Sequence, residues 1–316
     1  MKTLQAMILL IFTVNAFGAA DCDRACLKTT LDQYLNAVVK HDAAAAPLSI
    51  GFRQTENATV VKRSSGLWKT ATALGRVQRR YFDPVTGQAA YFGLIEENGS
   101  PAVVTLRLKV DNKEATEAEW VISRKGDPGL NGPAGGNVFD PDNLIANPPP
   151  DKLLGKDRMT REAMIAVTNS YFDGITTHDG SIIQAYAGCV RIENGAGMTG
   201  RGVPPRGGAT TPARGGAPAA ERDCTSGLET INIQNVAARL FPVVDEEAGV
   251  VLAMAVFIRK PGTATRRNMF GEWFFLENNK IRTIYATLFY PAPEMPVPNW
   301  PPYEGNWPLP LMGENK

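Results

Sequence analysis

The sequence predicts an α+β protein built from two copies of one domain. A phrase of the form Tyr-x-x-x-Val/Ile-x-x-His-Asp occurs near residue 34 and again near residue 171, and it contains the only two histidines, His41 and His178. A Glu-Asn pair follows each histidine, so an offset of 137 residues separates Glu56 from Glu193 as well as His41 from His178. In each copy a helical stripe precedes alternating strand-like runs, which indicates helices packed on a curved antiparallel sheet.

Residues 1–20 have the features of an export signal. Lys2 precedes a short apolar run at residues 7–14, and small residues suited to a signal peptidase follow at 16–20. The run is shorter than the roughly 18 residues that a membrane-spanning helix needs. We therefore expect a secreted or periplasmic protein whose mature chain has no membrane partner.

The balance of charges argues against nucleic acid as a partner. The chain has 33 basic and 32 acidic residues, which leaves no excess of positive charge to bind phosphates. The sequence lacks a nucleotide-phosphate motif, a GxSxG motif and an HExxH motif, which disfavours phosphoryl transfer, α/β-hydrolase chemistry and zinc peptidase chemistry. We expect no cofactor.

Four cysteines in an exported chain predict two disulfides. The pairing of Cys22 with Cys26 and of Cys189 with Cys224 is favoured, because the second pair brackets an insertion whose flanks belong together. Four cysteines allow three connectivities, and the other two stay open. A metal site is disfavoured because the spacing is not CxxC and each copy has one histidine.

The first copy is expected to span residues 21–125. A helical period begins near Leu27 and places His41 on the apolar stripe, pointing inward, while Asp42 is suited to cap a second short helix. After Pro47 the pattern changes to short strand-like runs, with a helical or irregular stretch ending near Arg80. The expected strands are residues 60–61, 66–68, 89–95, 102–110 and 117–124.

The second copy is expected to span residues 158–290, after a Gly/Pro-rich linker at 126–157. Within it, residues 195–223 consist mostly of Gly, Pro, Ala and Arg, which predicts a disordered insertion. Strands are expected at 250–259, 268–276 and 281–290. A Pro/Trp-rich tail, 291–316, ends the chain.

The repeated phrase, the Glu-Asn pair and the strand pattern after it together resemble the nuclear-transport-factor-2-like fold, also called SnoaL-like. The tandem, exported arrangement resembles a family of secreted fungal and bacterial proteins of unknown function. The resemblance implies two cone-shaped domains, each with a pocket between its helices and its sheet. It also implies a wide range of functions, from dehydratases, isomerases, cyclases and lyases to binding pockets without catalysis, and no catalytic residue of those enzymes maps onto this chain.

The residues of the repeated phrase are also candidates for acid–base chemistry. An inward histidine with a downstream carboxylate can move a proton next to a carbonyl, so His41 with Glu56 and His178 with Glu193 are the candidate catalytic pairs. Side chains that could bind a substrate or its developing oxyanion are Tyr34, Arg53, Asn57 and Trp68 in the first copy and Tyr171, Arg191 and Asn194 in the second. Because the phrase occurs twice, it is equally open to a structural interpretation.

Three hypotheses for function follow. The first is a cofactor-independent lyase or isomerase acting on a small apolar or aromatic metabolite. The second is a secreted protein that binds such a ligand without turnover, and the third is a carbohydrate-directed protein that stacks sugars on tryptophans 68, 120, 273, 300 or 307. The two copies are expected to pack on each other as a pseudo-dimer. The glycosylation sequons Asn57-Ala-Thr59 and Asn98-Gly-Ser100 are relevant in a eukaryotic host.

Overall fold

The computed structural model describes residues 21–132, 134–151, 158–199 and 222–295. The expected export signal at 1–20, most of the insertion at 195–223 and most of the tail, with Trp300 and Trp307, lie outside these ranges. Within them, no helix is long and apolar enough to cross a membrane.

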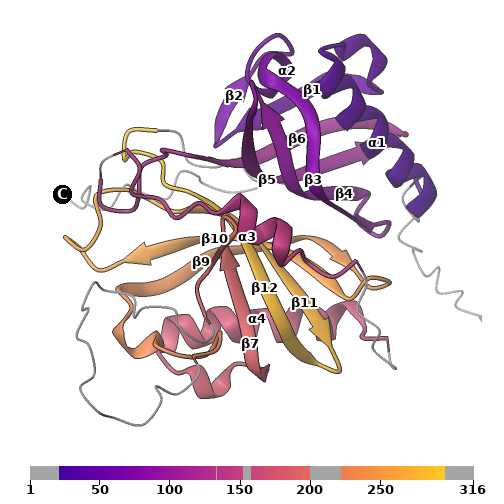
Figure 1. Cartoon of the computed structure of the whole chain (residues 1–316). Coiled ribbons are helices and arrows are strands. Elements are labelled where there is room, and N and C mark those ends of the chain that lie inside the picture. The colour runs from indigo at the N-terminus through magenta and orange to yellow at the C-terminus, as the bar shows by residue number, and fades with distance from the viewer. Residues whose placement is uncertain (1–20, 133, 152–157, 200–221, 296–316) are drawn as a thin grey trace, which may run out of the picture.

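Two six-stranded sheets with the same strand order form the molecule, which confirms an α+β architecture with two repeated units (Figure 1). In the first sheet the order is β2-β1-β6-β5-β4-β3, and in the second it is β8-β7-β12-β11-β10-β9. The elements of the first copy are α1 (Arg24–Lys40), η1 (Ala43–Ala45), β1 (Leu48–Glu56), β2 (Thr59–Val61), α2 (Leu67–Thr70), β3 (Ala71–Asp83), β4 (Gln88–Glu97), β5 (Ser100–Asp111) and β6 (Glu114–Arg124). Those that follow are α3 (Pro141–Ala146), α4 (Arg161–Thr177), η2 (Gly180–Ile182), β7 (Ala185–Glu193), β8 (Ala196–Gly197), η3 (Leu228–Thr230), β9 (Ile233–Asp245), β10 (Val250–Arg259), β11 (Met269–Glu277) and β12 (Lys280–Phe289).

Each sheet is mixed rather than antiparallel, which corrects the expectation from the strand pattern. The first long strand of each copy runs parallel to the last, β1 beside β6 and β7 beside β12, while the other neighbours are antiparallel. In the first copy the chain forms β1 and β2 at one side of the sheet and crosses to the opposite edge, and the meander from β3 to β6 then returns to β1; the second copy does the same. Alternation of apolar residues identifies a strand but carries no information on the direction of its neighbour, so the sequence pattern could not show this.

Two further expectations are wrong. Residues 66–68 are not a strand, because Leu67 begins the short helix α2, and the stretch up to Arg80 is not helical or irregular, because it belongs to the long strand β3. The pairing of β3 with β4 shifts register between Leu74 and Gln78. Such a bulge interrupts the alternation of buried and exposed residues, which concealed the strand in the sequence.

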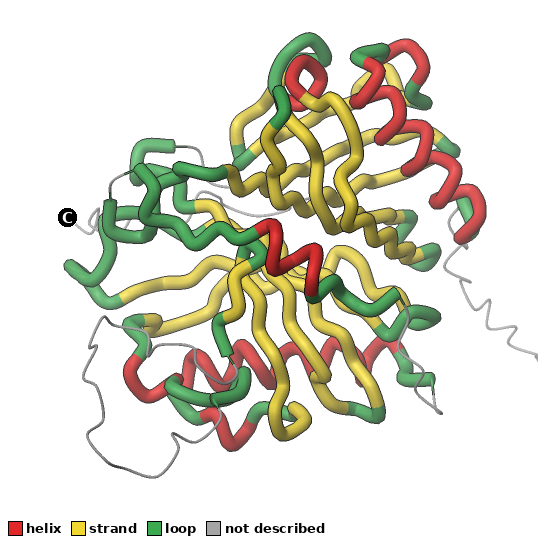
Figure 2. Tube along the Cα trace, in the orientation of Figure 1, coloured by secondary structure: helices red, strands yellow, loops and turns green. Residues whose placement is uncertain are grey.

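The sheets pack face to face, and the long helices α1 and α4 cover their outer faces (Figure 2). One core lies between α1 and the first sheet, and another lies between α4 and the second sheet. A third apolar cluster joins the two sheets and includes Tyr81 and Phe92 from the first copy and Trp273, Phe275 and Tyr285 from the second. Because successive strand residues alternate between faces, each sheet supplies one face to its helix and the other to its neighbouring sheet.

Two ion pairs cross between the copies in a reciprocal arrangement. Arg24, at the start of α1, binds Asp245 of the second copy with both terminal nitrogens, at 2.8 and 3.0 Å. Arg161, which lies 137 residues after Arg24 at the start of α4, binds Asp83 of the first copy at 2.7 Å. Each carboxylate also accepts a backbone N–H from the other copy at 2.9 Å, and both aspartates are fully buried in the interface. The contact is therefore isologous, as in a twofold dimer.

The segment expected as a linker, residues 126–157, is folded over its described part and contacts both copies. The Asn137 amide donates to Ser123 of the first copy and to the Leu288 carbonyl of the second. The carbonyl of Pro149 accepts from the Arg79 guanidinium at 2.7 Å, and helix α3 lies at the junction of the sheets in Figure 1. The described part of this segment therefore bridges the two copies.

Candidate functional site

The residue of the first copy that corresponds to Arg191 is Gln54, and not Arg53. The offset of 137 residues aligns Gln54 with Arg191, and both are buried at the same place in their sheets, two residues before Glu56 and Glu193 respectively. Arg53 is one residue out of register and exposed, because successive residues of a strand point to opposite faces. The two copies therefore differ in charge at this position.

A buried polar cluster surrounds Arg191 in the second copy. Its Nε donates to Glu193 Oε1 at 2.7 Å, and its Nη1 donates to the Tyr171 hydroxyl at 2.7 Å and to Glu272 Oε1. Arg191 is 6% exposed and Glu272 is 0% exposed. Burial alone would lower the pKa of Arg191, but the charges of Glu272 and Glu193 raise it well above its ordinary value. The guanidinium is therefore a fixed positive charge shared by two carboxylates.

Aromatic side chains fill the corresponding place in the first copy. The amide oxygen of Gln54 accepts from the Tyr34 hydroxyl at 2.6 Å and from the Trp68 indole at 2.7 Å. The indole of Trp120 donates to the Tyr34 oxygen at 3.1 Å. All four side chains are buried and neutral, and the Gln54 amide nitrogen donates to Glu56 Oε1 at 3.0 Å at the margin of the group.

The strand registers show how the second copy departs from this packing. Glu56 is paired with Trp120 in the first copy and Glu193 with Ala286 in the second, so Ala286 takes the place of Trp120. Leu106 is the neighbour of Trp120 on β5, and Glu272 is the neighbour of Ala286 on β11. Replacing one indole by a methyl group and one leucine by a glutamate accommodates the long, charged side chain of Arg191.

The fourth member of the cluster, Glu272, is not among the residues that the sequence pattern predicts for the site. It lies in an apolar run on β11, between Gly271 and Trp273, and a single acid in a buried strand was the signal that could have identified it. Tyr171, Arg191 and Glu193, three of the expected site residues, do lie together with it.

The two histidines do not lie on the buried stripe of their helices, which corrects the expectation that they point inward. His41 and His178 are the residues that end α1 and α4, each in the left-handed conformation with φ near 60°. His41 Nδ1 lies 2.9 Å from the Trp68 carbonyl oxygen, and His178 Nε2 lies 2.7 Å from the Ile233 carbonyl oxygen. The His41 ring therefore links the end of α1 to helix α2, and the His178 ring links the end of α4 to the start of β9.

The other polar residues of the phrase cap and clamp the backbone. Asp42 and Asp179 cap the short helices that follow, accepting the N–H of Ala44 and Ser181. In the first copy Glu56 accepts the Leu67 N–H at 2.8 Å, and burial raises its pKa. Glu56 thus holds the start of α2.

Asn57 and Asn194 bridge to the strand that runs parallel to their own. The side-chain oxygen of Asn57 accepts the N–H of Ile122 at 2.8 Å, and its nitrogen donates to the carbonyl of the same residue at 3.0 Å. Asn194 makes the same two bonds with Leu288, at 2.7 and 3.1 Å. Both asparagines have φ of 47°, which asparagine tolerates better than most residues. The amides extend the parallel ladder beyond the end of the strand.

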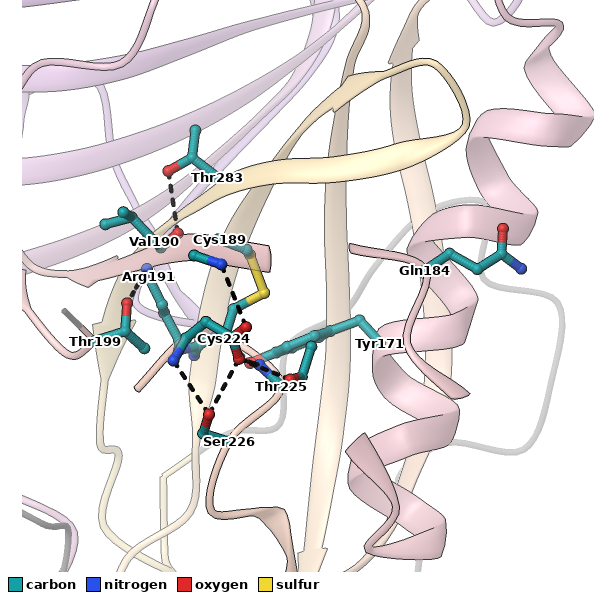
Figure 3. The surroundings of a disulfide bond; sticks show 12 residues. Tyr171, Gln184, Cys189, Val190, Arg191, Thr199, Cys224, Thr225, Ser226 and Thr283 are labelled. Atoms are coloured by element: carbon teal, nitrogen blue, oxygen red, sulfur yellow. Dashed lines mark hydrogen bonds between the residues drawn. A yellow bond between two sulfur atoms is a disulfide. The ribbon is translucent and has the colours of Figure 1, made fainter. Parts of the chain in front are cut away.

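The disulfides are Cys22–Cys26 and Cys189–Cys224, the pairing that the sequence favours. The second joins β7 to the end of the insertion next to the Arg191 cluster, and Figure 3 shows Arg191 and Tyr171 beside it. The backbone N–H of Arg191 donates to the Thr199 hydroxyl at 2.8 Å. The disulfide therefore fixes the strand that carries Arg191.

Neither a metal centre nor an exposed tryptophan platform is found in the described ranges. Over those residues, no three His, Cys, Asp or Glu side chains are gathered so that they could hold a metal ion. The rings of Trp68, Trp120 and Trp273 are buried in cores, so they offer no face to a sugar.

Comparison with known proteins identifies one domain. Residues 157–288 match the family model described as a domain of unknown function (DUF8021). The match covers the second copy, which contains the Arg191 cluster. No curated protein matches the chain.

Proposed function

We propose that the second copy binds a small ligand at the cluster of Tyr171, Arg191, Glu193 and Glu272, and that the first copy is its structural partner. The observation that carries this proposal is the difference between equivalent interiors, one filled by tryptophans and one charged. A buried charged group costs several kcal/mol more than apolar packing unless each charge is paired. A function of the cluster would explain why the second copy retains it.

The cluster would offer a ligand two carboxylates, a phenol and a guanidinium. An amine or a hydroxyl of the ligand could donate a hydrogen bond to a carboxylate, in exchange for a partner that the carboxylate has in the free protein. The surroundings are apolar and aromatic, with Phe274 and Phe172 packed against Tyr171. A small, mostly apolar or aromatic molecule with such a donor is the ligand that we propose.

The second candidate function is a cofactor-independent lyase or isomerase. It is favoured by the convergence of Glu193 with Tyr171 and Arg191, because a carboxylate can take a proton next to a carbonyl while the phenol and the guanidinium stabilise the oxyanion. In this form the chemistry uses the carboxylate, and His178 supports the fold.

The proposal extends to fold family and location. Helices on one face of a sheet whose first and last strands are neighbours support a SnoaL-like assignment for each copy. Two disulfides are typical of proteins that fold in an oxidising compartment, and together with residues 1–20 they support export.

A thermal-shift screen of small amines, alcohols and aromatic metabolites tests the proposal. The wild type is compared with Arg191→Gln combined with Glu272→Leu, which introduces the residues of the first copy and removes the Arg191 guanidinium together with one of its carboxylate partners. Arg53→Gln, at an exposed position of the first copy, is the matched control. A ligand should stabilise the wild type and the control and not the double variant.

Binding of the same ligand by the double variant would place the site elsewhere. Turnover by the wild type that is lost in Glu193→Gln would identify an enzyme. Saturable binding without consumption of the ligand would identify a binding protein.

A further inference from the structure

The two glycosylation sequons lie in opposite environments. Asn98 is exposed at the turn between β4 and β5, whereas Asn57 is 7% exposed and clamped to Ile122. Attachment of a glycan requires the side-chain nitrogen, and in Asn57 that nitrogen donates to a buried carbonyl. A sugar on Asn57 would therefore disrupt the buried contact with Ile122, so a folded chain should not carry one there.

The turn at Asn98 presents its side chain to solvent. Glu97 is paired with Ser100, so Asn98 and Gly99 form a two-residue hairpin loop, with φ of 49° and 80°. These values are those of a type I′ turn, in which Asn-Gly is strongly preferred. A Cβ placed on Gly99 would have nothing within 4 Å, so the space around the tip is open.

We propose that Asn98 is an N-glycosylation site and that Asn57 is not, when the chain passes through a eukaryotic secretory pathway. The donor is a lipid-linked oligosaccharide diphosphate. The bond between the Asn98 side-chain nitrogen and C1 of the first sugar forms as the bond between C1 and the diphosphate oxygen breaks, and the amide loses one proton. The proposal depends on export and is independent of the ligand site.

The glycan would make the two copies unequal on their surfaces. The equivalent hairpin of the second copy, between β10 and β11, runs from Lys260 to Asn268 without a sequon. Only the copy with the packed aromatic interior would carry the sugar. It would lie at the end of β4 opposite Gln88, away from the reciprocal ion pairs.

The test is expression of the full chain in a eukaryotic secretory host, with capture from cells and medium together. Intact mass is measured before and after treatment with peptide-N-glycosidase, and tandem mass spectrometry locates the Asn-to-Asp conversion that the enzyme leaves. A co-expressed secreted glycoprotein shows that the host is competent. The expected result is one glycan on the wild type, at Asn98.

Two variants, one for each sequon, remove the sequon without replacing its asparagine. Ser100→Ala should abolish the glycan while the Asn98 turn is kept, and Thr59→Ala should leave it unchanged while the Asn57 clamp is kept. A glycan on Asn57, or a wild-type chain that lacks a glycan beside a modified control protein, would overturn the proposal.

Discussion

The two copies share one fold but stabilise their interiors by different means. In the first, Gln54 is the centre of a network of neutral hydrogen bonds with Tyr34 and two tryptophans. In the second, Arg191 is held by Glu193 and Glu272. The same backbone therefore supports either a neutral hydrogen-bond network or an ion cluster at equivalent places beneath the helix. The comparison teaches that the fold itself does not require a charge at this position.

The two copies contribute equivalent ion pairs to the interface between them, and the largest predicted loss of stability tests this equivalence. Asp83→Ala removes an acceptor from Arg161 and from the Val244 N–H of the other copy. Asp245→Ala removes an acceptor from the Phe82 N–H and from Arg24, which keeps Glu247 at 3.2 Å. Each variant should cost about 3–5 kcal/mol of unfolding free energy. Urea unfolding of the two variants measures the costs. A large cost for one aspartate and a negligible cost for the other would contradict an isologous interface.

The disulfides distinguish the copies next. Cys189–Cys224 closes a separation of 35 residues and Cys22–Cys26 one of 4. In the chain-entropy model, replacing both cysteines by alanine should therefore cost about 4 kcal/mol of unfolding free energy for Cys189–Cys224 and about 2 kcal/mol for Cys22–Cys26. Denaturant titration of the two double variants gives both values. Equal losses would show that strain or structure in the unfolded chain outweighs loop length.

The third difference is a titrating group on the sheet face of the first copy. The pKa of Glu119 is raised to about 7, mainly because the carboxyl group is buried. The charge of Glu117 also raises this pKa, and the charges of Arg107 and Arg53 lower it. The equivalent residue in the second copy is Tyr285. The folded protein keeps the Glu119 proton at pH values where the unfolded chain releases it. Its contribution to stability is therefore full below about pH 4.5 and falls as the pH rises to about 7.

Glu119→Gln should remove that fall, which is on the order of 3 kcal/mol at most. Urea midpoints of the variant and the wild type from pH 4 to 8 measure it, with Glu117→Gln as the partly exposed control. Parallel stability curves for Glu119→Gln and the wild type would show that Glu119 stays ionised in the folded protein.

The smallest expected effect concerns the histidines. His41→Asn and His178→Asn keep a residue suited to the left-handed conformation but lose one hydrogen bond to a carbonyl, so each should cost about 1 kcal/mol. Melting temperatures and ligand titrations check both variants. Loss of ligand binding in His178→Asn at unchanged stability would show that His178 takes part in ligand binding.

The repeated phrase predicted the duplication because its residues have fixed backbone roles. His41, Asp42 and Asn57 end a helix, cap the next turn and clamp a strand, and the second copy keeps these residues at the same offset. The helices, most strands and the disulfide pairing followed from local patterns. Residues with such local roles repeat in sequence whether or not a copy has a function.

The charged cluster was harder to predict because Glu272 lies on β11, whereas Arg191 and Glu193 lie on β7. Glu272 contacts Arg191 across 81 residues, and only the strand register brings them together. Arg53, the candidate arginine of the first copy, lies one residue out of register with Arg191, and a shift of one residue moves a side chain to the opposite face of the sheet. The pairing of the strands determines which residues meet in the cluster, and a single sequence does not show that pairing.

The reciprocal ion pairs also have a consequence for the order of events during synthesis. Arg24 is made early, but its partner Asp245 is made 221 residues later. Until then the first sheet exposes the face that carries Tyr81 and Phe92, an apolar surface that invites aggregation. The first copy thus leaves the ribosome before the second copy can cover this face. A chaperone that binds the exposed face would raise the yield of the folded chain.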